Sequence, residues 1–157
     1  MTKETKQEFT LRITQANPTE MVVILYEMML CYLDDAEQAQ EAEDDAALAE
    51  AVRKSRGCLN ELENSLHMEY EPAGNLLQLY LYCAKKLVHV QAHKEGALYE
   101  IRIIIRPLRD AYAQIAKSNP KGSVMDNSQT VYAGLTYGRN TLTENMADQG
   151  TNRGMRV

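Results

Sequence analysis

Residues 17–33, with the sequence NPTEMVVILYEMMLCYL, decide the fold of this chain. Between Met21 and Leu33 the only charged residue is Glu27, and all the others are apolar or aromatic. A helix on the surface of a small protein needs a single apolar stripe, which faces the core. This segment therefore has more apolar surface than one such stripe requires.

The same segment carries the signals that begin a helix. Asn17 can act as the N-cap, Pro18 suits the first helical position, and Glu20 completes a capping box. An apolar pattern with helical spacing then continues for several turns. These features predict a helix from residue 17 to about Glu41.

The apolar side chains of this helix form two stripes when successive residues are placed about 100° apart. The stripe expected to face the core contains Val22, Leu25, Tyr26, Met29, Leu33 and Ala36. The second stripe, which we call the Met21 stripe, contains Met21, Ile24 and Met28. It indicates either a helix that is central in a compact bundle or a surface groove that a partner fills. Methionine adapts to irregular partners and suits the second alternative.

Three further helices are predicted by apolar residues at spacings of three and four. They are expected from the acids at 43–45 to about Leu66, from about 74 to 93, and from about 97 to 117. The connections between the four helices are only a few residues long, so helices adjacent in sequence should be antiparallel. The sequence therefore predicts an all-α fold, an antiparallel four-helix bundle over residues 17–118.

The helix expected over residues 74–93 is also apolar beyond the seam that faces the core. That seam contains Leu76, Tyr80, Cys83, Leu87 and Val90. The additional apolar residues are Leu77, Leu81, Ala84 and Val88, with Leu79 and Tyr82 widening the surface. Like the Met21 stripe, this surface indicates either a helix that is central in a compact bundle or a surface groove that a partner fills, since large exposed apolar patches usually mark an interaction site.

Two segments without a core of their own flank the bundle. The first, residues 1–16, is a short N-terminal arm that we expect to lie along the apolar groove as a strand or turn and to shield it. Its alternating apolar residues are Phe9, Leu11 and Ile13. The second, residues 119–157, is a non-helical C-terminal extension. Its Tyr132 and Tyr137 either pack onto the bundle or belong to a solvated tail.

Charge and composition exclude several classes of function. Ten acids and no Lys or Arg lie between Ile13 and Val52, and such a stretch repels the phosphates of nucleic acid. Apolar stretches are too short and too interrupted by charge to cross a bilayer, so we expect no membrane insertion. The start of the chain lacks the apolar region of a secretory signal. Three cysteines without CxxC pairing favour buried thiols, and together these features favour a cytoplasmic protein.

Catalytic and metal-binding patterns are weak. His89 and His93 are four residues apart, but Val90 follows His89, so there is no H-E-x-x-H motif. Phosphate-binding loops, nucleophile elbows and dinucleotide fingerprints are absent from the sequence. We expect no catalytic residue, no metal and no cofactor.

Three short motifs give the chain a resemblance to a known family. An apolar helix start contains Pro18, Glu20, Met21, Leu25 and Tyr26. A run of the form NLxxLYxY contains Asn75, Leu76, Leu79, Tyr80 and Tyr82. A third run contains Leu108, Arg109, Asp110, Ala111 and Tyr112. With the link ELENSLHMEY at 61–70, these motifs resemble the flagellar secretion chaperone (FliS) family over roughly residues 16–116.

The resemblance implies a cytoplasmic helical bundle without catalysis or cofactor. Members of the family bind the C-terminal segment of flagellin, prevent its premature polymerisation and deliver it to the flagellar export gate. Combined with the apolar surfaces above, this predicts partner contacts at Phe9, Leu11, Ile13, Met21, Ile24, Met28, Leu77, Leu81 and Tyr82. The chain departs from the family pattern at Phe9, which lies about one position from a usual Tyr, and at Pro72-Ala73-Gly74, where Gly–Gly is usual.

A different class of function is an alternative. A self-associating structural or regulatory protein could use the Met21 stripe to close a homodimer. An enzyme or a metal protein is a third and more distant alternative.

Overall fold

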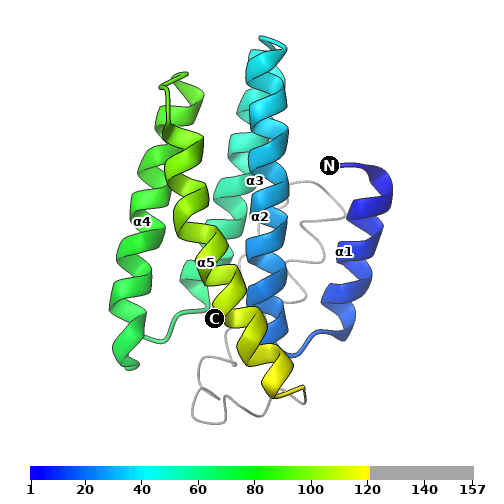
Figure 1. Cartoon of the computed structure of the whole chain (residues 1–157), viewed down its shortest axis with the longest axis vertical. Helices are drawn as coiled ribbons and strands as arrows, with labels where there is room; N and C mark the ends of the chain where they lie inside the picture. The colour runs from blue at the N-terminus through cyan, green and yellow to red at the C-terminus, as the bar shows by residue number, and fades with distance from the viewer. Residues whose placement is uncertain (121–157) are drawn as a thin grey trace.

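A computed structural model describes residues 1–120, and this part of the chain consists of helices without a strand (Figure 1). The helices are α1 (Lys3–Gln15), α2 (Pro18–Glu41), α3 (Asp45–Asn64), α4 (Glu71–Gln91) and α5 (Ala97–Ser118). Helices α2 to α5 pack in a ring, in which α2 contacts α3 and α5, and α4 contacts the same two helices. The predicted all-α bundle is confirmed. Predictions for Tyr132 and Tyr137 lie outside the described residues.

Local signals explain where the helices begin. The Asn17 side chain accepts a hydrogen bond from the Glu20 backbone, and the Glu20 side chain accepts one from the Asn17 backbone, so the predicted capping box is present. Asp44 caps α3 by accepting a hydrogen bond from the backbone N–H of Ala47. Gly96 precedes α5 with φ of 81°, a left-handed conformation that glycine adopts without strain. These contacts fix the short turns between antiparallel neighbours.

A cluster of three tyrosines joins three helices inside the bundle. The hydroxyls of Tyr26 on α2 and Tyr80 on α4 lie 2.6 Å apart in a buried hydrogen bond. The ring of Tyr112 on α5 lies 5.8 Å from the ring of Tyr26. Burial raises the pKa of both Tyr26 and Tyr80, so both hydroxyls stay neutral. A hydroxyl pair of this kind satisfies two polar groups that would otherwise be buried alone.

An ion-pair cluster ties α5 to α2 nearer the surface. Arg102 lies 2.7 Å from Asp34 and 3.0 Å from Glu37. The Arg102 side chain is largely buried, whereas the side chains of Asp34 and Glu37 are exposed. Two acids on the surface of α2 therefore help to hold α5 in place.

The predicted strand or turn in the N-terminal arm is wrong, because the segment is the helix α1. Thr2 caps this helix by accepting a hydrogen bond from the backbone N–H of Thr5. Phe9 and Ile13, four residues apart, are buried on one face, while Leu11 is 58 % exposed. The alternation of three apolar residues suggested a strand, but only the two with helical spacing enter the core.

Removing one tyrosine hydroxyl should cost more than removing both. Tyr26→Phe leaves the Tyr80 hydroxyl buried without a partner, and we expect a loss of about 1–3 kcal/mol in the free energy of unfolding. The double variant Tyr26→Phe/Tyr80→Phe should recover part of that loss, since no orphaned hydroxyl remains. Urea unfolding followed by circular dichroism measures these two variants and the single variant Tyr80→Phe. If the loss in the double variant equalled the sum of the losses in the two single variants, the two hydroxyls would not be coupled.

Candidate functional site

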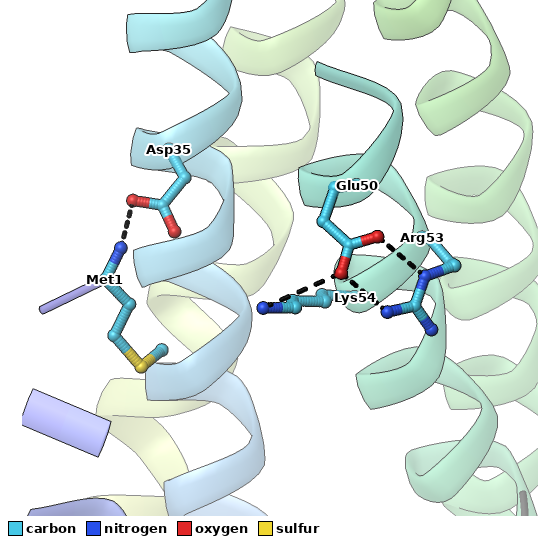
Figure 2. Close-up of polar contacts among 5 residues, drawn as sticks. All are labelled: Met1, Asp35, Glu50, Arg53 and Lys54. Atoms are coloured by element: carbon cyan, nitrogen blue, oxygen red, sulfur yellow. Dashed lines mark hydrogen bonds and ion pairs between the residues drawn. The ribbon is translucent and has the colours of Figure 1, made fainter. Parts of the chain in front are cut away.

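Helix α1 lies along the side of α2 that carries the Met21 stripe. Arg12 pairs with Glu27 at 2.6 Å, and the Met1 amino group pairs with Asp35 at 2.5 Å. Since the start of α1 meets the later part of α2 and its end meets the earlier part, the two helices are antiparallel (Figures 1 and 2). On a helical wheel, Asp35 lies between Ile24 and Met28, and Glu27 lies about 60° from Ile24, so both pairs are on the side of α2 that carries the stripe.

The Met21 stripe is buried in this arrangement. Met21 is 3 % exposed, and Ile24 and Met28 are each 2 % exposed. They belong to one apolar cluster with Phe9 and Ile13 of α1. The sequence left two alternatives open for this stripe, a surface groove or a part of the core. The stripe is covered by the chain's own N-terminal helix.

Few side chains hold α1 in place. Only Phe9 and Ile13 are buried on this helix, whereas twelve residues of α2 are buried. Burial of one apolar side chain contributes about 1.5–3 kcal/mol. The Arg12–Glu27 pair is partly exposed, and exposed ion pairs contribute little. The two buried side chains thus contribute about 3–6 kcal/mol to the docking of α1, and the pair of the Met1 amino group with Asp35 adds to it.

The α3 side of this surface includes a small charged group (Figure 2). Glu50 pairs with Arg53 at 2.7 Å, and the hydrogen bond from Arg53 holds the pKa of Glu50 below its usual value. The Lys54 ammonium lies 5.7 Å from the centre of the Tyr32 ring on α2. Burial lowers the pKa of Lys54, and the positive charge of Lys6 on α1 lowers it further.

The predicted contact residues on α4 lie elsewhere. In Figure 1, α4 and α1 are on opposite sides of α2. Leu77 is half-buried, whereas Leu81 is 53 % exposed and Tyr82 is 41 % exposed. The structure therefore does not bring the nine predicted residues into one groove. It separates them into a covered site, made by the Met21 stripe with Phe9 and Ile13, and an exposed site on α4.

A polar network fixes one edge of the α4 site. The Tyr82 hydroxyl donates a hydrogen bond to Glu100 of α5 at 2.8 Å, and Lys86 pairs with the same carboxylate at 2.6 Å. The hydrogen bond from Lys86 holds the pKa of Glu100 below its usual value. The Lys86 ammonium also lies 5.2 Å from the centre of the Tyr82 ring. Tyr82 is thus held in one orientation although its ring is exposed.

Several exposed apolar residues were not predicted as contacts. Val88 on α4 is 54 % exposed, and Tyr99 and Ile103 on α5 are 67 % and 51 % exposed. In the sequence, Val88 lies off the seam of α4 that faces the core, and this position could have identified it as a contact residue. Ile103 belongs to the run Ile103-Ile104-Ile105, in which the sequence alone does not distinguish the exposed position from the buried one.

Among residues 1–120, no three His, Cys, Asp or Glu side chains gather closely enough to hold a metal ion. His93 instead lies 3.0 Å from Asp45, at the start of α3. None of the five described helices is long and apolar enough to cross a membrane. Cys58 and Cys83 are buried, whereas Cys31 is half-buried.

These features define a class of protein, an all-α bundle whose central helix has an apolar stripe covered by an N-terminal helix. Residues 1–119 match the family described as "Flagellar protein FliS", and the chain belongs to this family. It is 27% identical over 110 residues to the flagellar secretion chaperone FliS of Bacillus subtilis (strain 168). That alignment covers 69% of this chain and 83% of the relative.

Loosening α1 should leave the bundle intact. Phe9→Ala removes one of its two buried side chains, and we expect tryptic cleavage within α1 to become about tenfold faster. Leu11→Ala, on the exposed face of the same helix, is the matched control and should change little. Thermal melting by circular dichroism should stay cooperative in both variants. Collapse of the bundle in Phe9→Ala would mean that α1 is an integral part of the core.

Proposed function

We propose that this chain is a cytoplasmic, non-enzymatic export chaperone that binds the C-terminal segment of flagellin. By occupying that segment it would prevent premature polymerisation, and it would then deliver the subunit to the flagellar export gate. Family membership supports the role in flagellar secretion. The choice of flagellin as the partner is part of the proposal.

One observation carries the proposed binding mode, which is that a helix already occupies the Met21 stripe. Helix α1 places Phe9 and Ile13 into the same apolar cluster as Met21, Ile24 and Met28. An amphipathic helix of a partner can use such a surface in the same way. We propose that the flagellin segment takes the place of α1, and that α1 shields the stripe in the free protein.

The weak attachment of α1 makes this exchange feasible. If the binding-competent state is the one with α1 released, the apparent affinity for flagellin is reduced by the fraction of chains in that state. Thioether side chains can adjust to a second occupant of different shape. In this proposal a further part of the flagellin segment contacts α4, at Leu77, Leu81 and Tyr82. Leu11 is exposed on α1 in the free protein.

The homodimer through the Met21 stripe is the competing proposal. Since α1 covers this stripe, a second copy could reach it only if α1 left or was exchanged between copies. Sedimentation of the chain alone separates the two proposals. A stable dimer that dissociates when Met28 is replaced by a charged residue would favour self-association.

Deleting residues 2–13 tests the role of α1 as a cover. The deletion removes the internal competitor, so we expect equal or tighter binding to flagellin from the same cell, together with increased binding of an apolar dye. Titration calorimetry measures the affinity, and flagellin without its C-terminal segment is the negative control. Loss of binding on deletion would place α1 within the binding site rather than over it.

The stripe itself is tested in the same shortened chain. Without α1, Met28 is no longer enclosed, so Met28→Glu should spare the fold and weaken flagellin binding about tenfold or more. Leu25→Ala is the comparison, because Leu25 is 1 % exposed in the bundle core and its truncation should cost ~2–5 kcal/mol of stability. Equal destabilisation by both changes would show that the stripe is core.

A further inference from the structure

Two acids of α2 border the Met21 stripe, and α1 supplies a cation to each of them. Glu27 is paired with Arg12 at 2.6 Å, and Asp35 is paired with the amino group of Met1 at 2.5 Å, as Figure 2 shows for the second pair. With α1 in place, the side chains of Glu27 and Asp35 are only 26 % and 30 % exposed. Any helix that covers the stripe therefore also withdraws two carboxylates from water, and these then need cations.

Helices α1 and α2 carry opposite charge. Helix α2 has six acids and no Lys or Arg, whereas α1 has three bases and two acids. On the α3 side of the stripe, Arg53 is paired with Glu50, and the Lys54 ammonium lies 5.7 Å from the centre of the Tyr32 ring. Positive charge is thus already present on the α3 side, whereas the α2 side depends on the occupant of the stripe for it.

We infer that the helix which replaces α1 on the Met21 stripe is basic where it faces Glu27 and Asp35. This inference rests on the proposed function, in which a partner segment takes the place of α1, and it names the chemistry of that segment. A neutral or acidic helix would cover the two carboxylates without pairing them, which is unfavourable. Glu27 and Asp35 are thus specificity-determining residues, because they discriminate between amphipathic helices with equally good apolar faces.

The spacing of the two acids sets the spacing of the bases. Glu27 and Asp35 are eight residues apart on α2, which is about 12 Å along the helix axis at about 1.5 Å per residue. Bases seven or eight residues apart span a similar distance on a bound helix. The occupant also needs apolar residues four apart, as α1 has in Phe9 and Ile13. The ligand class is therefore an amphipathic helix of about three turns or more with two bases beside its apolar seam.

Two synthetic peptides test the inference on the full chain without flagellin. Each is a labelled helix with the apolar spacing of α1, and the two positions that face the acids are Arg in the first peptide and Glu in the second. Helix α1 competes equally with both peptides, so the ratio of their apparent affinities does not depend on how firmly α1 is held. Replacing Arg by Glu exchanges two attractions for two repulsions, so fluorescence anisotropy at low salt should show about tenfold tighter binding of the Arg peptide.

Charge reversal on α2 locates the effect. Glu27→Lys should abolish most of the preference for the Arg peptide, and Glu27→Lys/Asp35→Lys should reverse it. The control Glu41→Lys/Glu43→Lys makes the same change in net charge at exposed positions outside the stripe, and it should keep the preference. This control separates pairing at the stripe from a general attraction of basic peptides to an acidic protein.

Three results would overturn the inference. They are equal binding of the two peptides or no binding of either, an unchanged preference in Glu27→Lys/Asp35→Lys, and a dimer formed by exchange of α1 that this double variant dissociates. Flagellin binding by the shortened chain is measured separately. If flagellin binds and the peptides show no preference, only the charge requirement fails, whereas a clear preference without flagellin binding would refute only the choice of flagellin as the partner.

Discussion

The two-sided apolar surface of α2 is the constraint on which the rest of the structure depends. Its core stripe is satisfied by the ring of α3, α4 and α5, and the hydroxyl pair of Tyr26 and Tyr80 sets how α2 and α4 face each other. The Met21 stripe lies outside this ring. Exposure of these apolar side chains to water is unfavourable, and helix α1 covers them in the free chain. The same feature thus explains the bundle, the presence of α1 and the location of the proposed binding site.

The bundle and the cover differ in how firmly they are held. Twelve buried residues make α2 the centre of the core, whereas α1 contributes two. Segments with few buried apolar contacts open at much lower free energy than the core of the same protein. In the proposed function, a site filled in turn by the internal helix and by the partner would avoid leaving a large apolar surface in water.

The helices of the bundle could be predicted from the sequence because caps and periodicity agreed. Asn17 and Glu20 fixed the start of α2, and seams with spacings of three and four identified α3 to α5. Helix α1 was missed because Phe9, Leu11 and Ile13 fit a strand alternation as well as a short helix. The candidate site was only partly predictable. A helical wheel gives directions around one helix, but it does not tell which faces of α2 and α4 become neighbours.

The central claim is that a partner displaces α1 from the Met21 stripe. Amide hydrogen exchange of residues 3–15, measured in the free chain and in a complex saturated with flagellin, tests it most directly. The account predicts that these amides lose protection in the complex, while those of α2 keep or gain it. Unchanged or increased protection of residues 3–15 in the complex would contradict displacement.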